Sequence, residues 1–273
     1  MPEFNLQSLP EPRVLGSDLD GTLIPLAGSE ENRRDLRTLA DSLERANREL
    51  VFATGRHLES VREAIAGEGL PRPRWMVCDV GATIYRATEG DFRPFLPYEE
   101  HLAGLTAGTG REEVEAALSR IDGLVPQGEA SQDRFKISYF APAERVGDLE
   151  REVGRVCAEA GLPFACTGSV DPFDGKGLID LLPAKVSKAY ALIWLSTHAD
   201  FKPEELVYAG DSGNDRAALT AGFRAIAVAN TDDDLAAAMT REMEGKGWEN
   251  RFYRAGRPAT SGVLEGCRHF GVV

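Results

Sequence analysis

The chain has 273 residues, 42% hydrophobic and 27% charged, which is ordinary for a globular protein with one large or two modest domains. Its net charge of −13 argues against a broad surface for a nucleic-acid backbone, so we expect no such partner. We expect no membrane partner either, because no apolar run approaches a membrane span and the first residues lack a signal-peptide pattern. The four cysteines are widely spaced without a CxxC pair, which favours free thiols and a cytoplasmic location.

The first part of the chain alternates between strand and helix patterns. Short apolar runs at 13–17, 50–53 and 75–79 predict buried strands. Between them, apolar residues spaced three and four apart predict helices at 32–49 and 57–66. This βαβαβ order indicates a doubly wound parallel sheet.

The pattern changes in the middle of the chain. Residues 81–97 alternate as a hairpin does, and residues 98–110, rich in Gly, Ala and Thr, predict a flexible loop. We therefore expect an α+β insert at 84–180 between two halves of a core domain, 1–83 and 181–273. The elements expected in the insert are helices at 111–121 and 143–160 and strands at 124–127, 135–140, 162–166 and 178–182.

After the insert, the alternation of helix and strand resumes. The whole chain thus predicts an α/β fold with a Rossmann-like core and an inserted α+β domain. The elements expected here are helices at 187–197, from 214, at 232–239 and at 261–269, and strands at 206–209 and 225–228.

Four motifs carry the chemistry, and each follows, or nearly follows, a predicted strand. They are Asp18-Leu19-Asp20-Gly21-Thr22, Thr54-Gly55-Arg56, Lys188, and Gly210-Asp211-Ser212-Gly213-Asn214-Asp215. In open α/β sheets the carboxyl ends of the strands form the ligand site, so these groups should meet. Two unit charges about 4 Å apart repel by about 4 kcal/mol at an effective dielectric of 20. Crowded carboxylates therefore indicate a bound divalent cation, here Mg²⁺, with a phosphate beside it.

Each acid suggests a role in phosphoryl transfer. Asp18 can attack phosphorus and form an aspartyl-phosphate, and Asp20 can serve as acid and base. Asp211 suits direct metal binding, whereas Asp215 either binds a metal water or orients the lysine. Asn214 either contacts phosphate or caps the next helix.

The remaining motif residues offer groups for an anion. Thr54 supplies a hydroxyl, and the turn of Gly55 and Arg56 supplies backbone N–H groups at a helix start. Lys188 would open a helix capped by Ser187, where a cation opposes the helix dipole unless an acid or phosphate faces it. Lys185 is the competing candidate.

These motifs resemble those of the haloacid dehalogenase superfamily of phosphohydrolases. The resemblance implies a phosphoaspartate at Asp18, an acid/base at Asp20 whose carbonyl also binds magnesium, and metal acids at Asp211 and Asp215. Thr54 and Lys188 match the remaining motif positions, and the insert resembles the large cap of the type IIB branch.

Further stretches narrow the resemblance to the sucrose-phosphate phosphatase-like group. They are residues 80–85, 135–139, 179–183, 186–188 and 261–266, and the Ser-Gly pair of the metal motif. True sucrose-phosphatases continue the first motif with Asn and an aromatic residue, whereas this chain has Gly21-Thr22-Leu23. The resemblance implies a sugar phosphatase, with sucrose-6-phosphate or mannosylfructose-phosphate as expected substrates. A phosphosugar mutase and a phosphatase for glucosylglycerol-phosphate or mannosyl-phosphoglycerate stay open as alternatives, as does the oligomeric state.

We expect the insert to select the sugar. Lys136 lies on the polar face of a predicted strand, and Gln127, Glu129 and Gln132 precede it in a loop. Polar groups of this kind bind sugar hydroxyls and reject analogues that lack them. The alternative is an exposed ion pair between Lys136 and Glu129, worth less than about 1 kcal/mol.

Overall fold

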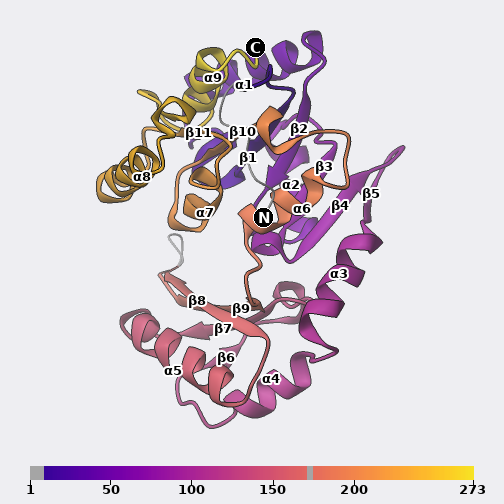
Figure 1. Ribbon diagram of the computed structural model, residues 1–273, viewed down its shortest axis with the longest axis vertical. Coiled ribbons are helices and arrows are strands. Elements are labelled where there is room, and N and C mark those ends of the chain that lie inside the picture. The colour runs from indigo at the N-terminus through magenta and orange to yellow at the C-terminus, as the bar shows by residue number, and fades with distance from the viewer. Residues whose placement is uncertain (1–8, 171–174) are drawn as a thin grey trace. The chain divides into compact units, whose positions relative to one another are not determined.

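The computed structural model describes residues 9–170 and 175–273, and these form two compact units (Figure 1). The first unit comprises the chain up to Pro94 and from Ser187 onward, and the second comprises Phe95–Val186. Among the described residues, no helix is both long and apolar enough to cross a bilayer.

The first unit is built on an eight-stranded sheet. Its strands from β12 to β3 pair in parallel, and β4 and β5 close one edge as an antiparallel hairpin. The order across the sheet is β12 (Phe252–Arg254), β11 (Arg224–Ala227), β10 (Leu206–Gly210), β1 (Val14–Ser17), β2 (Glu49–Ala53), β3 (Trp75–Cys78), β4 (Thr83–Ala87) and β5 (Phe92–Pro94).

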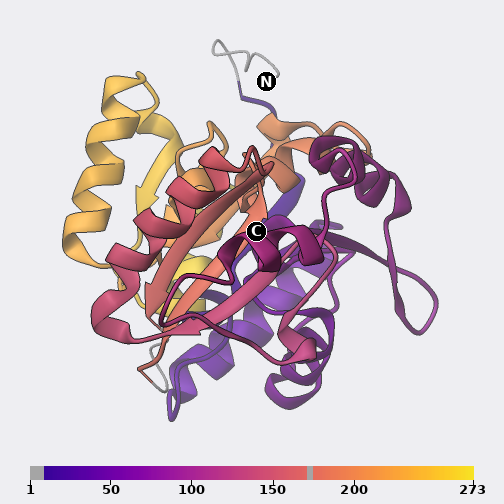
Figure 2. The same cartoon turned by 90° about the horizontal axis from the view of Figure 1, so that it is seen from below.

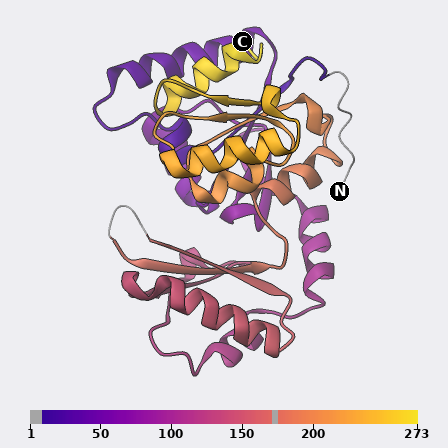
Figure 3. The same cartoon turned by 60° about the vertical axis from the view of Figure 1, so that its left-hand side comes forward.

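Helices cover this sheet, and α1 and α9 lie side by side (Figure 3). The helix α1 begins after Ser29, whose hydroxyl accepts the Asn32 N–H, and buries Leu36, Leu39 and Leu43, as the spacing of its leucines predicts. The helices are α1 (Glu30–Arg45), α2 (Leu58–Glu68), α6 (Lys188–Ser196), α7 (Arg216–Leu219), α8 (Asp233–Gly245) and α9 (Ala259–His269).

The second unit has its own four-stranded sheet, in the order β6 (Val125–Pro126), β7 (Ile137–Ala141), β9 (Gly177–Pro183) and β8 (Phe164–Val170). The helices α3 (Leu96–Thr106), α4 (Arg111–Leu118) and α5 (Val146–Glu159) complete it. The helix α5 lies along one face of the sheet (Figure 2), where Val146, Leu149 and Val153 are buried. This core is separate from that of the first unit.

The boundaries of the units differ from those expected. β4 pairs with β3, and β5 pairs with β4, so residues 84–94 extend the eight-stranded sheet and belong to the first unit and not to the insert. Residues 181–183 pair within the four-stranded sheet, so the second unit ends later than expected. Because a hairpin pattern does not reveal which sheet its strand will join, the sequence alone misplaces this boundary.

Residues 98–110 were also wrongly predicted as a loop. Most of them lie in α3, where Tyr98, Leu102 and Thr106 are buried at intervals of four. Gly104 between them lowers helix propensity, but burial of this stripe outweighs that loss. The short strand β12 was not predicted at all.

Candidate active site

The four motifs gather at the carboxyl ends of neighbouring strands in the first unit. Asp18 follows β1, Thr54 follows the adjacent β2, and Asp211 follows β10 on the other side of β1. Lys188 opens α6, which Ser187 caps by accepting the Tyr190 N–H, as predicted. The topology of the sheet therefore brings residues almost 200 positions apart to one place.

At the centre, Lys188 bridges two carboxylates. Its Nζ lies 3.0 Å from Asp18 Oδ1 and 2.8 Å from Asp215 Oδ1, and its side chain is fully buried. Lys185 is exposed, so Lys188 is the lysine that faces the acids. One cation buried between two anions leaves the cluster with excess negative charge.

The rest of the Asp215 carboxylate is held by its own neighbourhood. The buried hydroxyl of Tyr208 donates to Oδ1 over 2.6 Å. Oδ2 accepts the N–H groups of Asp211 and Ser212, both at 3.2 Å, and the Ser212 hydroxyl at 3.1 Å. Because the protein itself engages both oxygens, Asp215 is suited to anchor Lys188 and the metal motif.

The pKa directions reflect this crowding. Burial and the charge of Asp215 raise the pKa of Asp18 well above its usual value. Burial opposes the charge of Asp215, but the contact with Lys188 outweighs burial and lowers its pKa. Burial, and next the Asp215 charge, raises the pKa of Asp211 to about 6. Burial thus disfavours the ionised forms of Asp18 and Asp211, and the positive charge within the fold does not offset this.

Three acids could hold a cation together. One ligand atom each from Asp18, Asp211 and Asp215 lies within 4.8 Å of the others. The Thr22 hydroxyl donates a hydrogen bond to Asp211 Oδ1 over 2.9 Å, which restrains the orientation of that carboxylate. The donor set consists of oxygen atoms with excess negative charge, so the residues fit a hard divalent cation.

Asp20 lies outside this group of three acids and instead pairs with Arg56. The Arg56 Nε and Nη2 donate to the two Asp20 oxygens over 2.7 and 2.6 Å, while Nη1 donates to the Ser60 hydroxyl. The fully buried Thr54 accepts the Arg56 N–H at 3.1 Å through its hydroxyl. Arg56, expected to bind phosphate, here orients the predicted acid/base residue.

A strained turn directly after β3 contacts the loop that carries Thr54 and Arg56. Asp79 and Val80 both have a positive φ, which is rare for a β-branched residue such as valine. Their N–H groups donate to the carbonyls of Arg56 and Thr54. A side chain at Gly81 would collide with the Ser187 carbonyl, so the turn packs directly against the start of α6. Strain held in this way is typical of positions that fix a site.

Comparison with known proteins identifies the family. The sequence profile of the sucrose-6F-phosphate phosphohydrolase family matches residues 11–271. The chain belongs to this family. The family resemblance predicted from the motifs is therefore confirmed, and the chain is a phosphoric monoester hydrolase by class.

Individual relatives and solved structures support the assignment of this chain to the sucrose-phosphatase family. The mannosylfructose-phosphate phosphatase of Agrobacterium fabrum is 26% identical over 95% of this chain and 97% of its own. The sucrose-phosphatase of Synechocystis, solved with sucrose and phosphate, covers 96% of this chain and 98% of its own at 26% identity and a TM-score of 0.76. A haloacid dehalogenase-like hydrolase from Bacillus subtilis, 16% identical, matches over 98% and 95% with a TM-score of 0.66 and shows the fold alone. The predicted α/β fold class is confirmed.

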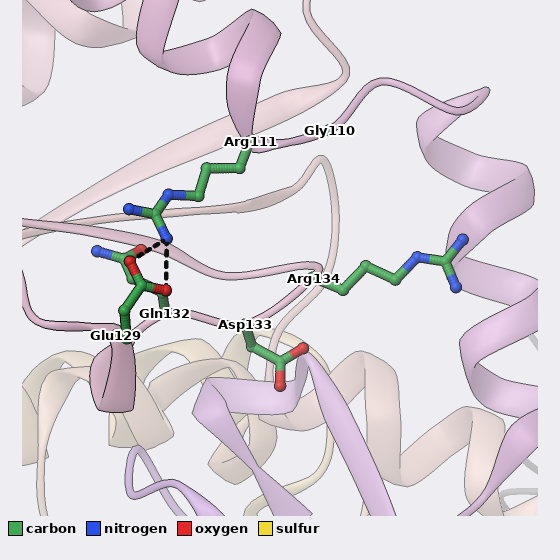
Figure 4. A pocket seen from close by; sticks show the side chains of 6 residues that line it. All are labelled: Gly110, Arg111, Glu129, Gln132, Asp133 and Arg134. Atoms are coloured by element: carbon green, nitrogen blue, oxygen red, sulfur yellow. Dashed lines mark hydrogen bonds and ion pairs between the residues drawn. The ribbon is translucent and has the colours of Figure 1, made fainter.

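Three of the expected sugar-binding residues bond other groups of the protein. The Gln132 side chain bonds the carbonyls of Gln127 and Ser138 and the Ser138 N–H, so it clamps the chain around β6 and β7. The two carboxylate oxygens of Glu129 both accept hydrogen bonds from Arg111 Nη1, over 3.0 and 3.1 Å (Figure 4). Gln127 donates to the Tyr139 carbonyl. Gln132 is thus suited to hold the hairpin rather than to bind a sugar.

The sugar-binding role of Lys136 stays a prediction, and the residue lies just before β7 and not within a strand as expected. Its side chain is buried, at 9% exposure, and precedes Ile137 of the core-facing stripe in β7. Nearby, a cavity of about 420 Å³ opens among residues of the same unit (Figure 4). Its lining residues are Gly110, Arg111, Glu129, Gln132, Asp133 and Arg134.

Asn214 is exposed beside the acids, where its side-chain oxygen accepts the Ser212 hydroxyl. Its exposed position in a short 3₁₀ turn is compatible with contact to an anion.

Three site residues were not predicted. Thr22 lies inside the first motif, but its contact with Asp211 depends on the fold. Tyr208 was taken as part of an apolar strand, although a buried tyrosine hydroxyl needs a partner, and this was the available signal. Asn230, whose amide nitrogen donates to Asp211 Oδ2 over 3.3 Å, follows β11, so the strand-end rule that located the motifs could have found it.

Proposed function

We propose that this protein is a magnesium-dependent sugar phosphatase that works through an aspartyl-phosphate on Asp18. The observation that carries the proposal is the buried Lys188 between Asp18 and Asp215, beside the half-buried pair of Asp20 and Arg56. A carboxylate nucleophile, a fixed cation and a second carboxylate within one site are the groups that covalent phosphoryl transfer needs.

In the first step, an Asp18 oxygen attacks phosphorus while the bond to the sugar oxygen breaks. Lys188 holds Asp18 in place, and the N–H of Leu19 donates to Asp18 Oδ1 over 2.7 Å, which leaves Oδ2 for attack. Asp20, in its protonated form, gives its proton to the departing sugar oxygen. In the second step, Asp20 takes a proton from water, and that water displaces phosphate from Asp18.

The divalent cation would be held by Asp18 and Asp211, with Asp215 behind them. When bound, it would offset the negative charge of the acids and of the substrate phosphate. The phosphate could then approach the Asp18 carboxylate with less repulsion. Magnesium is the cation proposed, because it is commonly bound through one or two carboxylates together with waters and phosphate oxygens.

The substrate class proposed is a disaccharide phosphate such as sucrose-6-phosphate or mannosylfructose-phosphate. The names of the family and of the Agrobacterium relative support it. To test it, we would measure inorganic phosphate release from disaccharide, hexose and glycerol-linked sugar phosphates. We expect the highest kcat/KM for a disaccharide phosphate. Transfer of phosphate within a hexose phosphate, without release, would instead show a mutase.

Removal of the metal should abolish turnover, and the stabilising effect of the metal should depend on pH. Because the pKa of Asp211 is raised to about 6, the metal-free folded protein keeps a proton that the unfolded chain loses from about pH 4 upward. The contribution of Asp211 to stability therefore falls between about pH 4 and 6 and stays low above that range. Magnesium binds the ionised form, so it should raise Tm more near pH 7.5 than near pH 5.

Calorimetry with excess Mg²⁺ and with chelator, at both pH values, would check this expectation. Full turnover in chelator, or an equal Tm increase at both pH values, would contradict the metal assignment.

Lys136→Ala should impair recognition of the sugar. We expect KM for the disaccharide phosphate to rise about tenfold, which corresponds to about 1.4 kcal/mol, with kcat/KM for an aryl phosphate little changed. The reason is that a buried ammonium can bond sugar hydroxyls, which an aryl phosphate lacks. Steady-state kinetics on both substrates would measure it, and equal losses on both would assign Lys136 to structure alone.

A further inference from the structure

The side chain of Asn230 ties three separate segments of the first unit together. Its amide nitrogen donates to the Gly21 carbonyl over 2.8 Å and to Asp211 Oδ2 over 3.3 Å. Its amide oxygen accepts the Ala259 N–H over 2.8 Å. One residue thus contacts the loop of the nucleophile, the metal motif and the first residue of α9.

These partners fix which way the amide faces. The Ala259 N–H can only donate, so it requires the Asn230 oxygen, and the NH₂ group must point toward Gly21 and Asp211. Ala259 itself has a φ of 47°, a conformation that alanine rarely adopts. The strained residue at the start of α9 is thus the one whose N–H donates to Asn230.

The start of α9 is itself firmly anchored. Thr260 is fully buried and donates its hydroxyl to the Leu23 carbonyl over 2.7 Å. Asn32 of α1 donates to the Ser261 hydroxyl over 2.7 Å and to the Pro258 carbonyl. A side chain at Gly266 would overlap Ile226, so this glycine lets α9 pack closely on β11. These contacts give a structural reason for the Ser261–Gly266 stretch that the sequence singled out.

Asp211 is consequently gripped on both oxygens. Thr22 donates to Oδ1 and Asn230 to Oδ2, while the backbone of Gly21 leaves no room for a Cβ against the same carboxylate. A carboxylate held on both sides cannot rotate freely, so its ligand atoms are already oriented for a cation.

We propose that Asn230, fixed by the start of α9, is a positioning residue that orients Asp211 for the divalent cation. This inference rests on the proposed metal dependence. Groups that orient metal ligands typically change metal affinity by about 10–100-fold when removed. The hydrogen bonds of Asn230 in the described part of the chain go to Gly21, Asp211 and Ala259 and not to Asp18, so its loss should weaken metal binding more than it slows the saturated enzyme.

The test is direct metal binding to the metal-free protein, with Mn²⁺ as the probe and free Mn²⁺ measured by electron paramagnetic resonance. We expect Asn230→Ala to bind Mn²⁺ at least about tenfold more weakly than the wild type. Excess Mg²⁺ should restore most of kcat. Asn230→Ser, whose hydroxyl is too short to reach all three partners, should show the same direction and serves if the alanine variant does not fold.

Asn32→Ala is the matched control. It removes a second asparagine that holds the start of α9, itself buried, but none of the hydrogen bonds of Asn32 in the described part of the chain reaches Asp211. It should lower Tm but reduce Mn²⁺ affinity far less than the Asn230 variants do, because Thr260 still anchors the start of α9 and Asn230 keeps its own contact with Asp211. Wild-type affinity in both Asn230 variants, or an equal loss in Asn32→Ala, would overturn the inference. A wild type that binds no Mn²⁺ would overturn the metal assignment itself, and this inference with it.

Discussion

Asp18→Asn should abolish turnover and leave the fold intact. Loss of a covalent nucleophile costs enzymes on the order of 10⁴-fold or more in kcat. The fold should survive because burial and Asp215 raise the pKa of Asp18, so the structure already favours an uncharged group there. In the absence of metal, we therefore expect a Tm equal to or above that of the wild type.

Phosphate release and calorimetry on the purified variant would check both parts. Trapping the wild type with a fluoride mimic of phosphate should place the mimic beside Asp18. Turnover by Asp18→Asn within about tenfold of the wild type would exclude the covalent mechanism.

Lys188→Met should damage stability as well as activity. The substitution keeps much of the side-chain volume but leaves Asp18 and Asp215 buried without their cation. Breaking a buried ion pair by removing one partner costs about 3–5 kcal/mol. Turnover should fall with it, because Lys188 also holds the nucleophile in place.

Lys185→Met is the matched control, since Lys185 is exposed and lies three residues away. Urea unfolding in the presence of Mg²⁺, together with kcat/KM, should show a loss in Lys188→Met and little change in Lys185→Met. A similar stability in the two variants would mean that Lys188 is not the counter-charge of the acids.

The sequence was sufficient to place the strand-end residues of the site, because one rule applies to all of them. Asp18, Thr54 and Asp211 follow apolar strands, and parallel strands present their carboxyl ends at one edge. The cap of α6 likewise followed from Ser187, whose hydroxyl bonds the Tyr190 N–H. Local signals of this kind are independent of what packs against them.

What the sequence did not reveal depends on contacts between distant segments. The partners of Tyr208 and Asn230 are set by where β10, β11 and α9 pack, which no local pattern encodes. The pairing of Asp20 with Arg56 is similar, because 36 residues separate them along the chain. The hairpin of β4 and β5 was assigned to the wrong unit because strand pairing is decided by the edge that is free to accept it.

The order of strands in the large sheet has a consequence for synthesis of the protein. β1 lies between β2, its next strand in the chain, and β10, with Val14 paired to Leu206. During translation, the edge of β1 that pairs with β10 therefore stays unpaired until the entire second unit has been synthesised. The unpaired edge of an apolar strand can form hydrogen bonds with strands of other chains and so promote aggregation. We expect nascent chains that end before β10 to aggregate or bind chaperones, and folding to be limited by this long-range closure.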